Sequence, residues 1–327
     1  MQTQLDTHVA PIARPAGVEN ALDVAQDCLL DGHLAAGLDD LFDHLDATRV
    51  GAPAAWPSYA QACLEHPIRS FLHQDPFTYR AFSKPRGYAG DAVMMDYIYG
   101  LGDAVEAARS ATPIGRAIFE YMDSRPSARA VRYRRRLLAR LIDAAAANGQ
   151  GRVFALAAGH LREVEFSEAV RTGRVQEFEA VDQDEASLAV VARDYARFGV
   201  QAQRGSVRQI LTGRADAGQF DLVYAAGLFD YLAAPVAAAL TCRLFDMTRP
   251  GGTLLIPNFL PGAPDRGYME SFMDWHLIYR NHADMRSLVN ALPPASVADF
   301  TIFDDDDDTI VFLQVTKGAI LRNRSVC

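Results

Sequence analysis

Two short stretches of this sequence hold polar side chains where parallel β-strands would end. The stretch LAAGHLRE, residues 156–163, follows the strand-like RVFA and contains Gly159, His160 and Arg162. Asp182 stands about 23 residues after Gly159, at the end of the strand-like QEFEAVD. Ligands of open α/β sheets bind at the carboxyl ends of the strands, and a carboxylate there can accept two hydrogen bonds from a ribose diol. The spacing therefore predicts a nucleoside site in which Gly159 allows a close backbone approach and Asp182 holds the ribose.

Two further stretches combine aromatic and charged side chains. Residues 73–91 mix aromatics, charges, prolines and glycines without a helical or strand period, and they end in KPRGYAGD. Long irregular segments inside compact domains are uncommon and often functional. The second stretch, MDWHLIYR, covers residues 273–280. We expect KPRGYAGD to form a lid and MDWHLIYR, within a helix over residues 269–280, to form a facing wall.

The second half of the chain alternates strand-like and helical stretches. From Gly151, five buried strand-like runs are separated by helical patterns, the first of which covers residues 162–173. VADFTIF and TIVFLQVTKG then follow, with only DDDDD (residues 304–308) between them. Alternation predicts a parallel sheet with right-handed crossovers, whereas two strands joined by a short polar run are antiparallel neighbours. We expect an α/β fold with a seven-stranded sheet, in which DDDDD forms the hairpin tip and, lacking EF-hand spacing, binds no calcium.

The first half of the chain is predicted to be helical. We expect one helix over residues 18–45, a second over residues 58–64, and others through AVMMDYIYG, IGRAIFEYMDS and SARAVRYRRRLLARLIDAAAA. We predict a loose segment at residues 1–18 and a helical substrate and lid region at residues 19–128. A catalytic domain is predicted at residues 129–320 and a tail at residues 321–327.

This order of elements resembles that of the class I methyltransferases, which have a Rossmann-like sheet of five parallel units closed by an antiparallel hairpin. The strings AAGHLRE, AAGLFDYL, PRGYAGD and MDWHLIYR are similar to those of a bacterial methyltransferase group. The named member of that group makes 3-hydroxypalmitic acid methyl ester, a quorum-sensing signal. The resemblance runs from about Pro67 to Lys317.

The resemblance implies S-adenosylmethionine as cofactor. This cofactor has no phosphate, so one glycine is enough where a dinucleotide loop needs three. In such a fold the third strand would bring Ser206 and Val207 to the adenine, mainly through backbone. The residues after the fourth strand, Ala226 and Gly227, would lie under the methionine part of the cofactor. The aromatic side chains of Phe229 and Tyr231 would form a wall beside it. The implied cofactor residues are thus Gly159, His160, Arg162, Asp182, Gln183, Ser206, Val207, Ala226, Gly227, Phe229 and Tyr88.

Each charged candidate also has a structural interpretation. Arg162 would hold the cofactor carboxylate as a bidentate pair, or else form a surface ion pair with Glu165 or Glu168. Asp182 would otherwise cap the following helix, although Asp184 fills that role at least as well. The alternative for Phe229 and Tyr231 is core packing.

The candidates around the transferred methyl group come from the lid and the wall. Tyr88 would lie over the acceptor or over the sulfonium, where an aromatic ring stabilises an onium by up to about 2 kcal/mol. Asp91 would contact the cofactor ammonium or the substrate, or cap the following helix. We predict Tyr88, Asp91, His276 and Asp274 as catalytic residues and Arg86, Tyr231, Asn258 and Tyr279 as substrate-binding residues, with Trp275 and Leu277 in the core.

The acceptor decides whether a base is needed. A carboxylate, with a pKa near about 4, is already ionised at neutral pH. An amine or phenol would need a base, and His276 and His73 are the candidates. We favour a carboxylate oxygen of a hydroxy-fatty-acid-like metabolite. The alternatives are a sulfur or nitrogen of an amino-acid-like metabolite, or a non-catalytic module that senses a cofactor or signal. A nicotinamide dehydrogenase would require the glycine-rich loop that the sequence lacks.

Composition limits the class of partner. The formal net charge of −9 argues against nucleic-acid binding, and the four cysteines include no CxxC pair that would suggest a metal site. We expect a small-molecule partner, no metal, no membrane span and a cytoplasmic location, with the oligomeric state left open.

Overall fold

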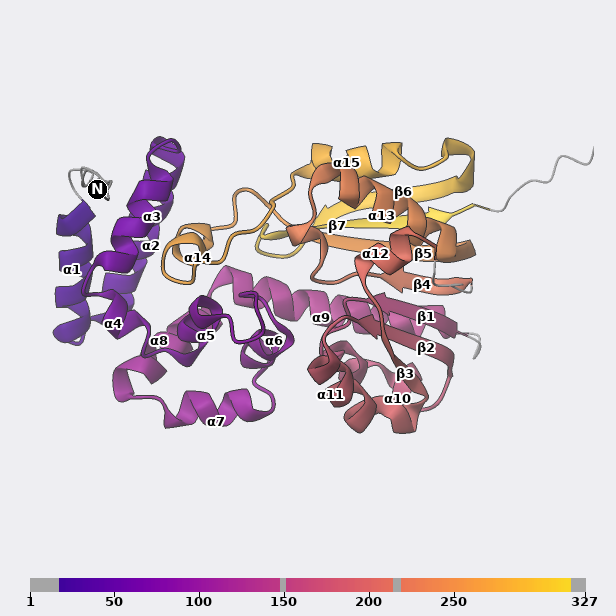
Figure 1. The fold of residues 1–327 in the computed structure, drawn as a ribbon, viewed down its shortest axis with the longest axis horizontal. Helices are drawn as coiled ribbons and strands as arrows, with labels where there is room; N and C mark the ends of the chain where they lie inside the picture. Colours follow the sequence, from indigo (N-terminus) through magenta and orange to yellow (C-terminus); the bar gives the residue numbers. More distant parts are fainter. Residues whose placement is uncertain (1–17, 148–150, 214–218, 319–327) are drawn as a thin grey trace, which may run out of the picture. The chain divides into compact units, whose positions relative to one another are not determined.

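The computed structural model describes residues 18–147, 151–213 and 219–318. The chain forms two compact units (Figure 1). The first comprises the chain up to Ala89 together with residues 106–122 and 265–275, and the second comprises residues 90–105, 123–264 and the chain from His276. The predicted loose segment up to residue 17 and the predicted tail lie outside the described residues.

Helices make up the first unit. They are α1 (Val18–Leu30), α2 (Leu34–Gly51), α3 (Trp56–Glu65), α4 (Arg69–Leu72), α5 (Pro76–Ser83), most of α7 (Asp103–Ser110) and of α8 (Pro113–Ser124), and α14 (Arg266–Ser271). The single helix predicted over residues 18–45 is wrong, because the chain turns at Gly32, which has a φ of 82°. The turn lays α1 beside α2 (Figure 1). A side chain at Gly37 would bring its Cβ within 2.6 Å of the Cβ of Cys28, so the two helices pack closely.

The irregular segment predicted over residues 73–91 is wrong for its middle part, which forms α5. Asp75 caps this helix through the N–H groups of Phe77 and Thr78, and Pro76 occupies its first turn. Both are standard signals for a helix start. The irregular part is shorter and begins at Lys84, which has a φ of 48°.

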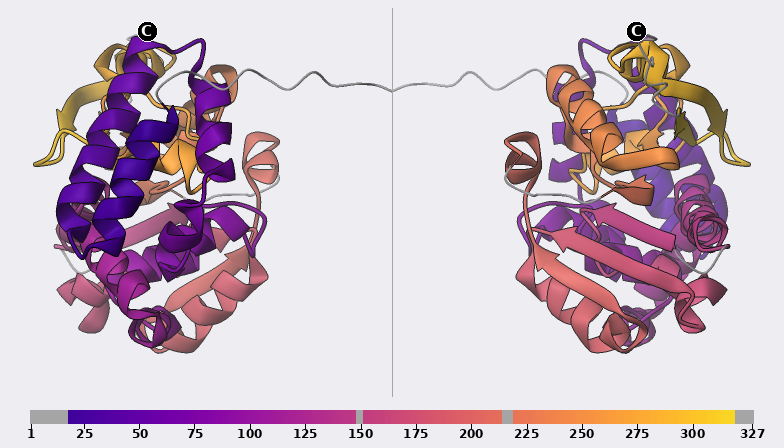
Figure 2. Two further views of the ribbon diagram at one scale, coloured as in Figure 1. Left: turned by 90° about the vertical axis from the view of Figure 1, so that its left-hand side faces the viewer. Right: turned by 90° about the vertical axis from the view of Figure 1, so that its right-hand side faces the viewer.

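The described residues of the second unit form a seven-stranded sheet of order β3-β2-β1-β4-β5-β7-β6. Five strands are parallel neighbours and β7 runs antiparallel to β5 and β6, which confirms the predicted α/β fold. Figure 2 shows the β6–β7 hairpin, in yellow, at one edge of this sheet. The strands are β1 (Gly151–Leu156), β2 (Val175–Asp182), β3 (Val200–Arg204), β4 (Phe220–Tyr224), β5 (Thr248–Phe259), β6 (Val297–Asp304) and β7 (Ile310–Lys317).

Helices cover the sheet because alternate side chains of each strand point to opposite faces. Phe154, Val223 and Leu254 pack in one core cluster with residues of α12 (Val207–Leu211), α13 (Ala234–Met247) and α15 (His282–Asn290). Helix α9 (Pro126–Ala145) contacts β1 and β4, and α11 (Glu185–Tyr195) contacts β2 and β3. Each fully buried phenylalanine contributes roughly 1.5–3 kcal/mol, so this core holds the strand ends in fixed positions.

Two predicted helices differ from the structure. Residues 162–173 form a 3₁₀ turn, η1 (Arg162–Phe166), and one turn of α-helix, α10 (Glu168–Arg171), because the Oγ of Ser167 caps α10. The helix predicted over residues 269–280 ends at Ser271. Beyond it the backbone N–H of Trp275 bonds the carbonyl of Met269, and the N–H of Arg280 bonds that of Phe259.

Two turns next to the strands depend on glycine and aspartate residues. Gly251 has a φ of 80°, and at Gly252 a Cβ would lie 2.8 Å from the carbonyl oxygen of Phe220, so this turn requires both glycines. The DDDDD run forms the predicted hairpin tip, where Asp305 accepts hydrogen bonds from the backbone of Asp307 and Thr309. No helix within the described residues is both long and apolar enough to cross a membrane.

Candidate functional site

The loop after β1 has an unusual backbone. Ala157, Gly159 and Leu161 have φ values of 52°, 55° and 52°. This left-handed region costs about 1–2 kcal/mol for a residue that has a Cβ. A Cβ on Gly159 would also lie 3.2 Å from the Cβ of Ala92, at the start of α6 (Ala92–Tyr99). The glycine is therefore required both by its φ and by a close approach, and the two strained neighbours mark the loop as a functional candidate.

Asp182 fastens this loop to the end of β2. Its Oδ2 accepts a hydrogen bond of 2.8 Å from the N–H of Gly159, and its Oδ1 accepts one of 2.8 Å from the N–H of Asp184. Asp184, and not Asp182, caps α11, since its side chain accepts from Ala186. Among the described residues, the side chain of Asp182 is bonded only by backbone N–H groups, so its carboxylate keeps lone pairs for a ligand.

The predicted neighbours of Asp182 lie on the same edge. Gln183 follows it and is exposed. The N–H of Gly205, after β3, bonds the carbonyl of Asp182 at 2.9 Å, which brings Ser206 to this edge. Ser206 and Gln209 form a capping box at the start of α12. The Ser206 side chain is therefore occupied, and the backbone around Ser206 and Val207 remains for a ligand.

His160 and Arg162 converge on a residue that the sequence did not suggest, Asp96 on α6. The Nδ1 of His160 lies 2.8 Å from Oδ2 of Asp96. Arg162 donates to the same carboxylate from Nε at 2.8 Å and from Nη2 at 3.0 Å. All three side chains are buried. No local pattern links Asp96 to the loop, because 64 residues separate it from His160.

The assignment of Arg162 to the cofactor carboxylate is not supported. Its remaining nitrogen, Nη1, donates to Asp194 at 3.0 Å, to the hydroxyl of Tyr195 at 3.1 Å and to Glu165 at 3.4 Å. The alternative partner Glu165 is present, but in a buried network with Asp96 and not as an isolated surface pair. The guanidinium is thus engaged by protein acceptors and positions the loop.

The electrostatics of this network keep Asp96 ionised. Burial alone would raise the pKa of Asp96, but hydrogen bonds from His160 and Arg162 and the positive charge of Arg162 outweigh it and lower the pKa. With Asp96 accepting from Nδ1, a neutral His160 presents Nε2 as an acceptor. That Nε2 is buried and has no hydrogen-bond partner among the described residues. A buried polar atom without a partner is a place where a ligand donor would fit.

A second buried carboxyl group lies beside the loop. Glu163 accepts a hydrogen bond of 2.6 Å from the hydroxyl of Tyr224, the last residue of β4. Burial raises the pKa of Glu163 above its ordinary value. Sequence reasoning missed this pair, although Glu163 directly follows the GHLR residues.

The residues after β4 differ in exposure, and some lie at the surface while others are buried in the core. Ala226 is half-buried and Gly227 exposed, as a ligand platform requires. Phe229 is 0% exposed and packs in the core cluster, so its assignment as a cofactor wall is corrected to core packing. Tyr231, also predicted near the site, is 38% exposed.

The substrate assignment of Asn258 is also corrected. Its Nδ2 donates to the carbonyls of Phe259 and Ile278, and its Oδ1 accepts from Arg280 at 2.7 Å. Asn258 is fully buried and all of these contacts are internal, so it anchors the segment after α14. On that segment His276 is exposed and Tyr279 half-buried.

The remaining candidates occur in both units. Asp91, in the second unit, caps α6 by accepting from Met94, which confirms the structural alternative. Tyr88 and Arg86, in the first unit, are half-buried. Within the same unit Lys84 forms an ion pair with Asp274, Trp275 is buried as predicted, and His73 bonds the carbonyl of Phe272. Leu277, in the second unit, is only half-buried.

Comparisons with known proteins support the fold. No protein-family model matches the chain, and no curated protein does. A solved structure from Bordetella parapertussis, described as a possible exported protein, is 17% identical with a TM-score of 0.53, covering 80% of this chain and 97% of that one. The N-methyltransferase NodS from Bradyrhizobium japonicum is 14% identical with a TM-score of 0.40, covering 57% and 96%. Magnesium protoporphyrin IX methyltransferase from Synechocystis, with bound SAH, is 11% identical with a TM-score of 0.46, covering 70% and 96%.

Proposed function

We propose that this chain is an S-adenosylmethionine-dependent methyltransferase acting on a small metabolite. The main support for this proposal is the buried carboxylate of Asp182, which links the end of β2 to the strained loop after β1 through the N–H of Gly159. Strand order reverses between β1 and β4, since β1 lies between β2 and β4. Ligands of open α/β sheets bind at such a point.

The residues at this edge fit the parts of the cofactor. Asp182 would accept hydrogen bonds from the ribose hydroxyls, and the backbone at Ser206 and Val207 would contact the adenine. Nε2 of a neutral His160 would accept from the ammonium group, since it is a buried atom next to this loop that has no partner among the described residues. Ala226 and Gly227 would support the methionine chain.

The bound cofactor supplies a methyl group on a sulfonium, which is already a good leaving group. The protein residues then have to align the acceptor with that methyl group and exclude water, and orientation contributes about 7–11 kcal/mol to such reactions. The roles of Asp91 and His276, both in the second unit, near the transferred methyl remain part of this proposal. An ionised carboxylate acceptor would need neither of them as a base.

We favour a carboxylate oxygen of an apolar, hydroxy-fatty-acid-like acceptor. In the second unit Tyr231 and Ile278 are large apolar side chains that are 38% and 41% exposed. They lie close in the fold, because the N–H of Ile278 bonds the carbonyl of Asp230 at 2.7 Å. Tyr279, in the same unit, would complete acceptor binding. A sulfur or nitrogen acceptor on an amino-acid-like metabolite is the alternative.

Calorimetric titration of the full chain with S-adenosylmethionine and S-adenosylhomocysteine tests the cofactor. Asp182→Asn should weaken binding roughly 10- to 150-fold, the loss of about 1.5–3 kcal/mol expected for hydrogen bonds to a charged group. Asp184→Asn is the matched control, because Asp184 caps α11 and asparagine caps nearly as well. Absence of binding by the unmodified chain, or equal weakening in both variants, would refute the proposal.

The acceptor is tested by incubating the protein with methyl-labelled cofactor and a cell extract, followed by mass spectrometry. A labelled methyl ester would support the favoured acceptor, and a labelled sulfonium or amine would support the alternative. Cofactor binding without any labelled product would instead indicate the sensing module.

A further inference from the structure

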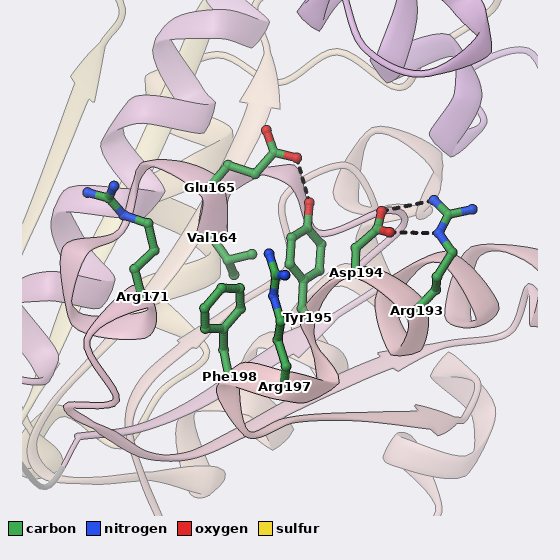
Figure 3. Close-up of a pocket in the computed structure, with 8 residues that line it drawn as sticks. All are labelled: Val164, Glu165, Arg171, Arg193, Asp194, Tyr195, Arg197 and Phe198. Atoms are coloured by element: carbon green, nitrogen blue, oxygen red, sulfur yellow. Dashed lines mark hydrogen bonds and ion pairs between the residues drawn. The ribbon is translucent and has the colours of Figure 1, made fainter.

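A pocket of about 400 Å³ lies in the second unit, outside the loop after β1. Its lining comes from η1, α10, the end of α11 and the 3₁₀ turn η2 (Ala196–Phe198) (Figure 3). The volume is within the range of pockets that hold small organic ligands.

Arginines dominate the polar lining of this pocket. Arg171 and Arg197 lie on opposite sides of Phe198 and Val164 (Figure 3). Within the described residues, neither arginine forms an ion pair with a carboxylate; Arg171 donates only to the carbonyl of Ser167, at 3.4 Å. Both are exposed at the mouth. Their two guanidiniums therefore add positive charge to this part of a chain whose net charge is −9.

The acidic residues of the pocket are already neutralised. Asp194 accepts from Arg193 at 2.7 and 3.0 Å and from Arg162 at 3.0 Å. Glu165 accepts from the hydroxyl of Tyr195 at 2.7 Å and pairs with Arg135. The pocket wall is therefore preformed, and its carboxylates offer little repulsion to an anion.

The floor of the pocket is apolar. Val164 is buried, and Phe198 lies under the guanidinium of Arg197, 4.7 Å from Cζ to the ring centroid. A guanidinium stacked on a ring keeps its N–H edge free for a planar or tetrahedral oxyanion. An oxyanion between Arg171 and Arg197 would leave its organic part over Val164 and Phe198.

We propose that this pocket binds a small organic oxyanion, a carboxylate or phosphate attached to an apolar or aromatic body. Arg171 and Arg197 hold the charged group, and Phe198 with Val164 contacts the body. The proposal does not depend on the identity of the cofactor or the acceptor, because none of these residues belongs to the cofactor edge.

Calorimetric titration of the full chain with phenyl phosphate and with benzoate tests this site. We expect saturable binding of at least one probe. The probe that binds more tightly shows whether the pocket prefers a phosphate or a carboxylate. The double variant Arg171→Gln/Arg197→Gln should weaken that binding at least tenfold while its circular dichroism spectrum is unchanged. Arg197→Lys should give a smaller loss, since lysine keeps the charge and loses the planar stack.

Arg286→Gln is the matched control, because Arg286 is also exposed and lies 5.3 Å from the ring centroid of Phe300. Its binding should equal that of the unmodified chain. Three results would overturn the proposal: no saturable binding of either probe, equal weakening in the control variant, or inorganic phosphate binding as tightly as the organic probes. The single variants Arg171→Gln and Arg197→Gln replace the double variant if it does not fold.

Discussion

Asp96→Asn is the most informative change to the network that positions the loop after β1. Asp96 accepts two hydrogen bonds from Arg162 and one from His160, and its side chain is 6% exposed, against 9% for that of Arg162. Asparagine offers one acceptor oxygen and turns an amide N–H₂ toward one of these donors. Breaking a buried ion pair costs about 3–5 kcal/mol, but Arg162 keeps Asp194 and Glu165 as charged partners in the variant. We therefore expect the second unit to lose about 2–3 kcal/mol of unfolding free energy at pH 7, below the full cost of an unpaired buried cation.

Urea denaturation followed by far-UV circular dichroism measures this loss. Both tryptophans, Trp56 and Trp275, belong to the first unit, so their fluorescence reports separately on that unit. The control is Asp123→Asn, which breaks a pair with Arg132 in which the Asp123 side chain is 45% exposed. Such an exposed pair contributes about 0–1 kcal/mol.

The pH dependence provides a second test of the same variant. The pKa of Asp96 is lowered in the folded protein, so its stabilising contribution is present above the unfolded value of 3.8 and is lost as pH falls through the folded value. The difference between the unmodified chain and Asp96→Asn should therefore shrink below about pH 4. A loss under about 1 kcal/mol at pH 7, or one that does not shrink in acid, would refute the reasoning.

Three other outcomes are expected. Asn258→Ala should cost about 2–4 kcal/mol in urea titrations, since it removes an acceptor from buried Arg280 and two donors from backbone carbonyls; native stability would contradict the anchoring role. Burial raises the pKa of Asp75 to about 6, so its contribution is present below pH 3.8 and is lost as pH rises through 6. We therefore expect the unfolding free energy of the first unit, followed by tryptophan fluorescence, to fall by on the order of 3 kcal/mol between pH 4 and 8 relative to that of Asp75→Asn. A difference between the two proteins that does not change with pH would refute this. Gly159→Ala should cost about 1 kcal/mol more than Gly100→Ala, because both have positive φ but only Gly159 meets a neighbouring side chain; equal urea midpoint shifts would contradict the close approach.

Local patterns predicted the sheet of the second unit because its strands are short, buried and separated by helices. Predictions were wrong where a single turn or a distant partner decided the backbone. Gly32 divides a continuous helical pattern into α1 and α2. Over residues 272–280 an apolar pattern compatible with a helix gives way because the N–H groups of Ile278 and Arg280 bond Asp230 and Phe259 instead. Such hydrogen bonds between residues far apart in the sequence cannot be predicted from a local sequence window.

The candidate site was predictable to the extent that it lies at strand ends. The position of Asp182 follows from the length of one strand–helix–strand unit, and the structure places it there. Asp96 was not predictable, because it lies on a helix with no periodic relation to the loop it holds. Arg162 and Asn258 were assigned from residue type alone, and their buried partners were needed to show that they support the site without reaching a ligand.

The charges at this edge indicate which ligands it suits. Asp96 neutralises Arg162, so that arginine is not available to an anion. The carboxylate of Asp182 is bonded only by backbone N–H groups of the described chain, and Nε2 of a neutral His160 that donates from Nδ1 to Asp96 is an acceptor. A pyrophosphate would be repelled here and would find a single glycine in place of three. A ligand with a ribose diol, an ammonium group and a sulfonium offers donors and positive charge to these acceptors, and this is why the sulfonium cofactor fits the edge better than a dinucleotide.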